Sequence, residues 1–116
     1  MTESYFVRGH KSLDTEQTQS AFRLFLLGAK EGDESCQQVL GYLYDEGIGV
    51  KRNVENAIYW YDRACMIGKS SAAAYNLMLL YRCLGMEKLA SKYRKRAAIL
   101  GDMEALREIE NNFATK

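Results

Sequence analysis

The sequence predicts an all-α chain: a right-handed superhelical stack of helical hairpins with about six helices. The main evidence is a group of small residues that occurs three times, its later members standing 7, 8 and 11 positions after the first. On a helix this spacing places small residues nearly on one line, so that a neighbouring helix can approach closely. The copies are offset by 36 and 33 residues, a period typical of stacked helical hairpins. Proline is absent from all 116 residues, as expected of a nearly all-helical chain. The groups are Ala21, Gly28, Ala29, Gly32; Ala57, Ala64, Cys65, Gly68; and Ala90, Ala97, Ala98, Gly101.

Apolar periodicity and helix-end signals place the helices in order. We expect them at about 14–30, 34–46, 53–67, 70–83, 87–100 and 102–113. The expected N-caps are Asp14 or Ser12, Asn53 and Asp102, and the expected C-terminal glycines are Gly32, Gly68 and Gly101.

The two inner hairpins differ in their loops. Gly47-Ile48-Gly49-Val50 begins a long connection, in which Val50 is expected to pack against the core. Leu84-Gly85 makes a short connection, which accounts for the shorter second period.

One stretch carries a specific repeat motif. Residues 40–50 hold an apolar-Gly pair, a Tyr three residues after the glycine and a Gly-x-Gly-Val loop; Ala-x-x-Trp-Tyr-x-x-Ala and a glycine follow at 57–68. This pattern closely resembles the Sel-one-like repeat family, an all-helical relative of the tetratricopeptide repeats. The resemblance implies a single repeat domain over 14–116, with a half unit at 14–32, a full unit at 33–68, a degenerate unit at 69–101 and a half cap at 102–116. Residues 1–13 would form an N-terminal capping segment.

Composition narrows the functional classes. The formal net charge of +1 offers no general attraction to nucleic acid or to an anionic membrane, and no apolar run approaches the length of a membrane span. Residues 1–4 do not begin a secretory signal, and three cysteines without a Cys-x-x-Cys pair fit a reducing compartment. We therefore expect a cytoplasmic, bacterial-type protein if Met1 is the native start.

The sequence offers little for catalysis, so we expect no enzyme, no metal and no cofactor. His10 is the sole histidine, with no cysteine or carboxylate nearby at ligand spacing, and Gly47-x-Gly49 is a repeat turn rather than a phosphate loop. Cys36 and Cys65 are interpreted as small core residues, and Cys83 as an exposed helix-end thiol. The competing hypothesis is a small hydrolase or nuclease built on Asp45, Glu46 and His10, which would require those three side chains to converge in space.

Aromatic and basic residues are also interpreted structurally. Tyr44, Trp60, Tyr61 and Tyr93 fall in register for helix packing, so we expect a core position, with Trp60 foremost, rather than a base-stacking platform. The dense basic cluster in 88–96 is expected to be a solvated convex face, with nucleic-acid binding the weaker alternative.

In such arrays the first helix of each pair lines the inner surface. The resemblance therefore implies a concave binding face rich in Tyr and Arg, the residue types that dominate binding hot spots. The register of the middle helix is open by one residue. The expected residues are Gln38, Tyr42, Asp45, Tyr75, Leu79, Arg82, Arg107, Asn111 and Ala114.

The first predicted helix carries an unusual apolar pair. Leu26 and Leu27 stand where the later copies have Asp62-Arg63 and Lys95-Arg96. We infer that this helix lacks a partner helix and is covered by the N-terminal segment with Tyr5 and Phe6, by a second copy of the chain, or by a binding partner. The N-terminal segment is favoured, and a homo-oligomer through this helix stays open.

These observations favour a non-enzymatic protein–protein interaction module. The leading hypothesis is a small inhibitor or immunity protein that neutralises one partner, such as a co-encoded toxin, because so short an array offers one modest surface. An adaptor or scaffold in a regulatory or signalling complex is nearly as well supported, and a nucleic-acid-binding repeat is more remote.

Overall fold

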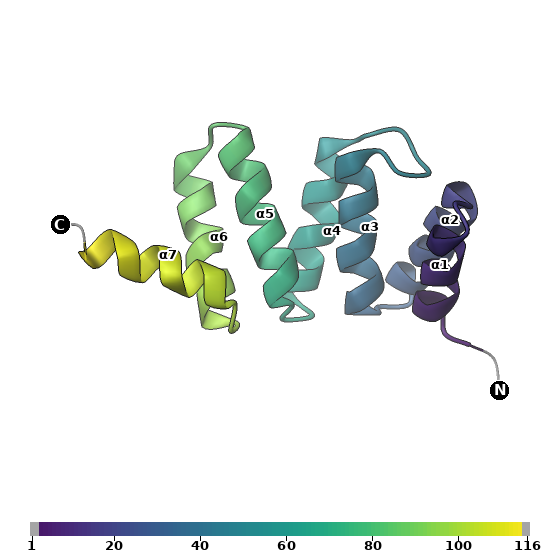
Figure 1. Cartoon of the computed structure of the whole chain (residues 1–116), viewed down its shortest axis with the longest axis horizontal. Helices are drawn as coiled ribbons and strands as arrows, with labels where there is room; N and C mark the ends of the chain where they lie inside the picture. The colour runs from purple at the N-terminus through teal and green to yellow at the C-terminus, as the bar shows by residue number, and fades with distance from the viewer. Residues whose placement is uncertain (1–2, 115–116) are drawn as a thin grey trace.

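The computed structural model describes residues 3–114, with side chains as far as Asn112. Within this range it contains seven α-helices packed in sequence as helical hairpins, which confirms the all-α stack (Figure 1). The helices are α1 Tyr5–Asp14, α2 Thr18–Lys30, α3 Glu34–Glu46, α4 Val54–Met66, α5 Ser71–Cys83, α6 Glu87–Ile99 and α7 Met103–Ala114.

The hairpins stand side by side along an elongated molecule of 53 × 30 × 23 Å (Figure 1). Each odd-numbered helix from α1 to α5 pairs with the even-numbered helix that follows it, and α7 packs against α6. Neighbouring odd-numbered helices also contact one another. The molecule therefore has an odd-helix face and an even-helix face.

The extra helix is α1, which occupies the predicted N-terminal capping segment. Ser4 caps it by accepting a hydrogen bond from the backbone N–H of Val7 at 3.1 Å. The predicted start of the next helix was wrong: Asp14 is the last residue of α1, and Ser12 lies inside α1. Glu16 then adopts a left-handed φ of 61°, and α2 begins at Thr18 without a side-chain cap.

Helix α1 pairs with α2, so the expectation that the helix carrying Leu26 and Leu27 lacks a partner helix was wrong. Gly9 lies against Phe25 so closely that a Cβ there would stand 2.7 Å from the ring. The N-terminal segment is thus the cover that the structure places on α2. Tyr5, Phe6 and Leu26 pack against the first core cluster, whereas Leu27 stays 48% exposed.

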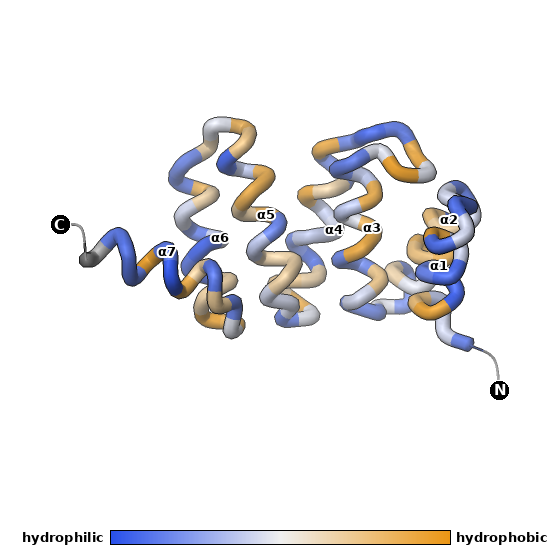
Figure 2. The backbone as a smooth tube through the Cα atoms, viewed as in Figure 1, coloured by the Kyte–Doolittle hydropathy of each residue, from blue (hydrophilic) through white to orange (hydrophobic). Residues whose placement is uncertain are grey.

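Two hydrophobic clusters divide the core. The first is built on Phe25, Leu40 and Leu43, and the second on Tyr61, Leu77 and Met78. Hydrophobic and hydrophilic residues alternate along most of the helices, as expected of amphipathic segments (Figure 2). The alanines of the three groups are buried between helices except for the half-buried Ala98, whereas the closing glycines Gly32 and Gly101 are exposed at the turns.

The predicted core aromatics separate into two groups. Tyr61 is fully buried and Tyr93 nearly so, whereas Tyr44 and Trp60 are half-buried at the edges of the clusters. Trp60 is therefore a packing residue but not the central one. Tyr61 has the largest fully buried side chain among the described residues.

The turns follow the predicted glycines with one exception. Gly32 and Gly101 have left-handed φ values of 94° and 104°, and Asn53 caps α4 as expected. At the end of α4 the left-handed residue is Lys69, with φ 60°, rather than Gly68. Gly68 serves close packing instead, because a Cβ there would lie 2.5 Å from the Cβ of Glu34.

The long loop of the first inner hairpin reaches back to the preceding hairpin. Gly49 has φ 72°, and a Cβ there would lie 2.1 Å from the carbonyl oxygen of Thr18. Ile48 packs against the first cluster from this loop, and Val50 is half-buried.

Candidate functional site

The odd-helix face carries a groove between α3 and α5, with a volume of about 350 Å³. Three of the residues expected on the binding face lie together in it: Tyr42, Asp45 and Leu79. We call it the α3–α5 groove. Its full lining is Tyr42, Asp45, Glu46, Arg52, Tyr61, Asn76, Leu79, Leu80 and Cys83.

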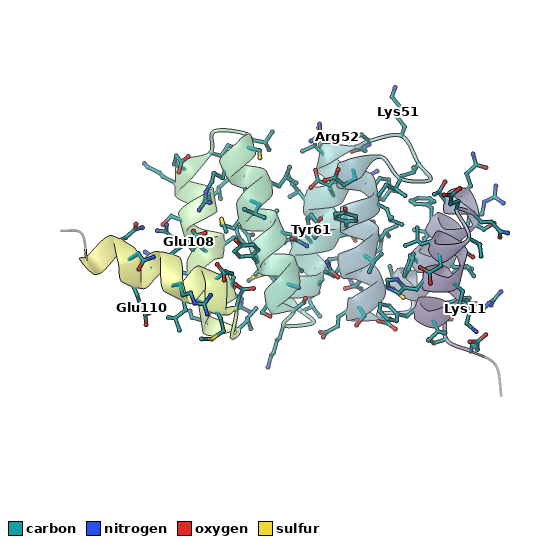
Figure 3. The ribbon with its side chains drawn as sticks, in the orientation of Figure 1. Lys11, Lys51, Arg52, Tyr61, Glu108 and Glu110 are labelled. Carbon is teal, nitrogen blue, oxygen red and sulfur yellow. The ribbon has the colours of Figure 1, made fainter. Side chains whose placement is uncertain are left out.

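Arg52 lies at the loop end of the groove, beside the C-terminus of α3 (Figure 3). Its Nε donates to the carbonyl oxygen of Asp45 at 2.7 Å, and its Nη2 lies 3.5 Å from the Asp45 carboxylate. The guanidinium thus satisfies a carbonyl in the last turn of α3, where the helix dipole favours positive charge. Glu46 is the other acid of the groove, and it forms none of the ion pairs found among the described residues.

The middle of the groove is apolar and partly open to solvent. Tyr42 is 45% exposed and Leu79 is 37% exposed, so both present surface to a ligand. Tyr61 reaches the groove from α4, and its ring needs Gly41, where a Cβ would lie 2.7 Å away. Burial, followed by the nearby carboxylates of Asp45 and Glu46, raises the pKa of Tyr61, so its hydroxyl is neutral at physiological pH.

The other predicted face residues lie outside the groove, mostly around α7. Arg82 donates to the Glu108 carboxylate at 2.8 Å (Figure 3 labels Glu108), and burial, followed by the Glu108 charge, raises the pKa of Tyr75. Arg107 pairs with Glu104 along α7. Gln38 is half-buried on α3, and Asn111 is exposed on α7. The side chain of Ala114 lies outside the described residues.

Several lining residues were not predicted from the sequence. Asn76 and Cys83 stand three residues before and four residues after Leu79, which places them on the same face of α5 and made them predictable. Arg52 had no such signal, because its position depends on how the loop folds back over α3.

Of the residues considered for chemistry, Asp45, Glu46 and Cys83 line the groove, whereas His10, Cys36 and Cys65 lie outside it. The ring of His10 packs edge-on against Phe6 and Phe25, at centroid distances of 4.4 and 5.1 Å. Burial, followed by the nearby Asp33 carboxylate, raises the pKa of Cys36 to about 12, and burial followed by Asp62 raises that of Cys65 to about 11. Both thiols are therefore protonated and inert at neutral pH. Cys83 is exposed at the groove edge.

The described residues show neither a metal-binding cluster nor a helix able to span a membrane. No cluster of three or more His, Cys, Asp or Glu side chains is arranged to hold a metal ion within residues 3–114. None of the helices in that range has both the length and the apolar character that crossing a bilayer requires.

Sequential helical hairpins with a groove between their first helices define a helical repeat protein of the solenoid class. The model of the Sel1 repeat family matches residues 9–33 and 35–69. The chain therefore belongs to the Sel1 repeat family, as its motif predicted, and is a module of the kind used for protein–protein interaction.

Relatives of known structure and name agree with this assignment. The crystal structure of a Sel1 repeat protein from Oxalobacter formigenes matches 92% of the chain with a TM-score of 0.78 and 25% identity. The chitin synthase regulator SKT5 of Saccharomyces cerevisiae is 30% identical over 93 residues, and the DAP3-binding cell death enhancer 1 of Rattus norvegicus is 35% identical over 54 residues. These two alignments cover 80% and 47% of the chain. The chain corresponds to 44% of the solved protein and to 13% and 11% of the two curated relatives.

Proposed function

We propose that the chain is a non-enzymatic binding module that holds a segment of a partner protein in the α3–α5 groove. The observation that carries this proposal is the pair Tyr42 and Leu79, two partly exposed apolar side chains from different hairpins that line one groove. Tyrosine is enriched among residues that dominate binding energy, and ligand grooves combine an apolar centre with a few polar groups.

The charges of the groove indicate which charge the partner segment should have. Asp45 is engaged by Arg52, whereas Glu46 has no ion-pair partner among the described residues. Helices α3 and α5 also end beside the groove, and their C-termini favour positive charge. A segment with an apolar anchor and an adjacent Lys or Arg would therefore fit best.

A regulatory or adaptor role has the better support among the finer functions. One matching relative is named a chitin synthase regulator and another a DAP3-binding protein, so relatives with this repeat are described through regulation or binding. The inhibitor or immunity role with a co-encoded toxin draws no support from these relatives. It stays the alternative to be separated by experiment.

The test begins with co-purification from the native host, followed by isothermal titration calorimetry with each identified partner. The double variant Tyr42→Ala/Leu79→Ala should weaken binding about tenfold or more, as expected when two anchor residues are removed. The control is Tyr59→Ala, which removes an aromatic side chain of similar exposure from the even-helix face. Equal affinity of the wild type and the double variant would refute the groove.

The same experiment separates the two finer roles. Several partners that all lose affinity with the double variant would establish an adaptor. One stoichiometric enzyme whose activity disappears on binding would establish an inhibitor. Cytoplasmic location is part of this proposal and is checked by fractionation of the host.

A further inference from the structure

The even-helix face carries a second groove, between α4 and α6, with a volume of about 460 Å³. A hydrogen bond links its two helices: the hydroxyl of Tyr93 on α6 donates to the Asp62 carboxylate on α4 at 2.7 Å. We call it the α4–α6 groove, and the residues that matter to its chemistry are Met66, Lys88, Lys92, Lys95, Arg96 and Ile99.

The cations of this groove form a stripe on one helix. Lys88, Lys92, Lys95 and Ile99 follow one another at steps of four, three and four residues, so they lie on one side of α6 over about 16 Å. Every ion pair among the described residues lies elsewhere in the chain, so no carboxylate neutralises these lysines. The nearby Asp62 is already engaged by Tyr93.

Arg96 also lines the groove. Its Nε is buried without a hydrogen-bond partner, and its Nη2 reaches the carbonyl oxygen of Cys65 only at 3.5 Å. The guanidinium as a whole is positively charged, so a ligand carboxylate bound in the groove would interact favourably with it.

Apolar surface lies next to these charges. Met66 is 45% exposed at the end of α4, and Ile99, at 77%, is the most exposed large hydrophobic residue among the described side chains. Met66 and Ile99 are the last residues of α4 and α6, so the groove has an apolar end, with the row of lysines extending from it along α6. A ligand that matches both the apolar end and the lysine row must itself be amphipathic and acidic.

We infer that the α4–α6 groove binds an acidic amphipathic helix of a partner protein. Apolar side chains of that helix would pack between Met66 and Ile99, and its carboxylates would pair with Lys88, Lys92, Lys95 and Arg96. This surface is separate from the α3–α5 groove, so the chain would engage partner segments on both faces.

The groove fits a peptide better than a nucleic acid or a lipid surface. Tyr93 is the sole aromatic side chain in its lining, and it is only 7% exposed, stacked on Tyr81 and bonded to Asp62, so no ring is free to stack on a base. The apolar residues border a hollow between two helices, a shape suited to an inserted helix rather than to a bilayer.

The test is an NMR titration of the whole ¹⁵N-labelled chain with a synthetic probe. The probe is a helical peptide of Glu, Leu and Ala with Leu on one face and Glu along both edges. We expect saturable shift changes confined to the α4–α6 groove, weakened by added salt. A matched peptide with Gln in place of Glu should bind about tenfold or more weakly.

Charge-reversal variants locate the site. Lys92→Glu/Lys95→Glu should weaken binding of the Glu peptide about tenfold or more, and Ile99→Ser should weaken it less. Lys30→Glu/Lys51→Glu, with the same charge change at exposed positions outside the groove, is the matched control and should leave binding unchanged. All of these side chains are substantially exposed, and circular dichroism checks that each variant is folded.

Three outcomes would overturn the inference: no saturable shifts in the groove, equal binding of the Glu and Gln peptides, or equal losses in the groove and control variants. Tighter binding of polyuridylate RNA or of phosphatidylserine vesicles than of the Glu peptide would also overturn it. Tyr42→Ala/Leu79→Ala should leave peptide binding unchanged, which keeps this result independent of the proposed function.

Discussion

Hairpins α3–α4 and α5–α6 correspond helix by helix, with offsets of 37 and 33 residues and 13 residues in each helix. In the first hairpin Gly41 on the first helix leaves room for the buried ring of Tyr61 on the second. The corresponding residues of the second hairpin are Met78, fully buried, and Arg94, half-buried with an unpartnered Nε. The large apolar side chain has thus moved from the second helix to the first, which shows that the repeat preserves helix packing while exchanging the residues that provide it.

The two hairpins also differ in how they attach to the hairpin before them. The loop at 47–53 brings Gly49 into contact with the backbone of α2, whereas the loop at 84–86 is short and leaves open space around Gly85. The second hairpin is tied to α4 by the hydrogen bond from Tyr93 to Asp62 instead. The first junction therefore combines this close backbone contact with a buried hydrogen bond from Gln37 to the carbonyl oxygen of Ala29, whereas the second has a side-chain hydrogen bond and no such loop contact.

The largest loss of stability is expected at Tyr61, which is fully buried, in contrast to its half-buried neighbour Trp60. Tyr61→Ala should lower the free energy of unfolding by about 3–5 kcal/mol, because it empties a fully buried aromatic site. The adjacent Trp60→Ala should cost less than half as much, since Trp60 is only half-buried. Urea denaturation measures both, and a larger cost for Trp60 would contradict the assignment of Tyr61 as the central residue.

The loop glycines form a matched pair. Gly49→Ala should destabilise the chain by about 2–4 kcal/mol, because it combines a left-handed φ with a clash against the carbonyl oxygen of Thr18. Gly85→Ala should cost only about 1 kcal/mol, since its φ of 74° is strained but its surroundings are open. Thermal and urea unfolding compare the two, and equal costs would mean that the loop contact adds nothing to stability.

Alkaline pH should lower the folding stability of the chain through the two buried thiols of the first hairpin, Cys36 and Cys65. Cys36 and Cys65 have pKa values raised from 9.0 to about 12 and 11, so the unfolded chain loses their protons at lower pH than the folded chain does. Their contribution to stability is complete below pH 9.0 and falls as the pH rises toward 11, by about 1 kcal/mol for each thiol at pH 10.

The second hairpin indicates which substitution tests this pH dependence, because Ala73 and Ala98 stand at the positions that correspond to Cys36 and Cys65. Cys36→Ala/Cys65→Ala should therefore unfold in urea with a weaker dependence on pH between 8 and 10. An unchanged dependence would show that other groups cause the alkaline loss.

The smallest effect is expected at the junction of α4 and α6. Tyr93→Phe removes the bond to Asp62 and should cost about 1 kcal/mol. Tyr42→Phe, at an exposed ring with no hydrogen bond from its hydroxyl in the described structure, should leave the free energy of unfolding nearly unchanged. A loss of the same size in both variants would place the Tyr93 effect outside this bond.

The helices after α2 were predictable to within one residue at each end. Alanine and glycine spacing located α4 and α6, and the N-cap role of Asn53 was evident because a helix start depends on neighbouring residues alone. Helix α1 was missed because it is only ten residues long, half of them polar, and it gains stability by packing on α2. Of the residues predicted on the binding face, Tyr42, Asp45 and Leu79 line one groove, whereas Arg82 pairs with Glu108 of α7.

The sequence by itself determined the repeat: the helix lengths, the line of small residues between helices and the family to which the chain belongs. These properties depend on spacing within one helix or across one turn, where local geometry is the same in every helical hairpin. The tertiary structure alone decided that Arg52 lies over Asp45 and that Arg82 pairs with Glu108 of α7. It also decided that three lysines without a carboxylate partner line one groove with Met66. Such contacts depend on the path of the loops and on the rotation of one helix against another, which no spacing along the chain specifies.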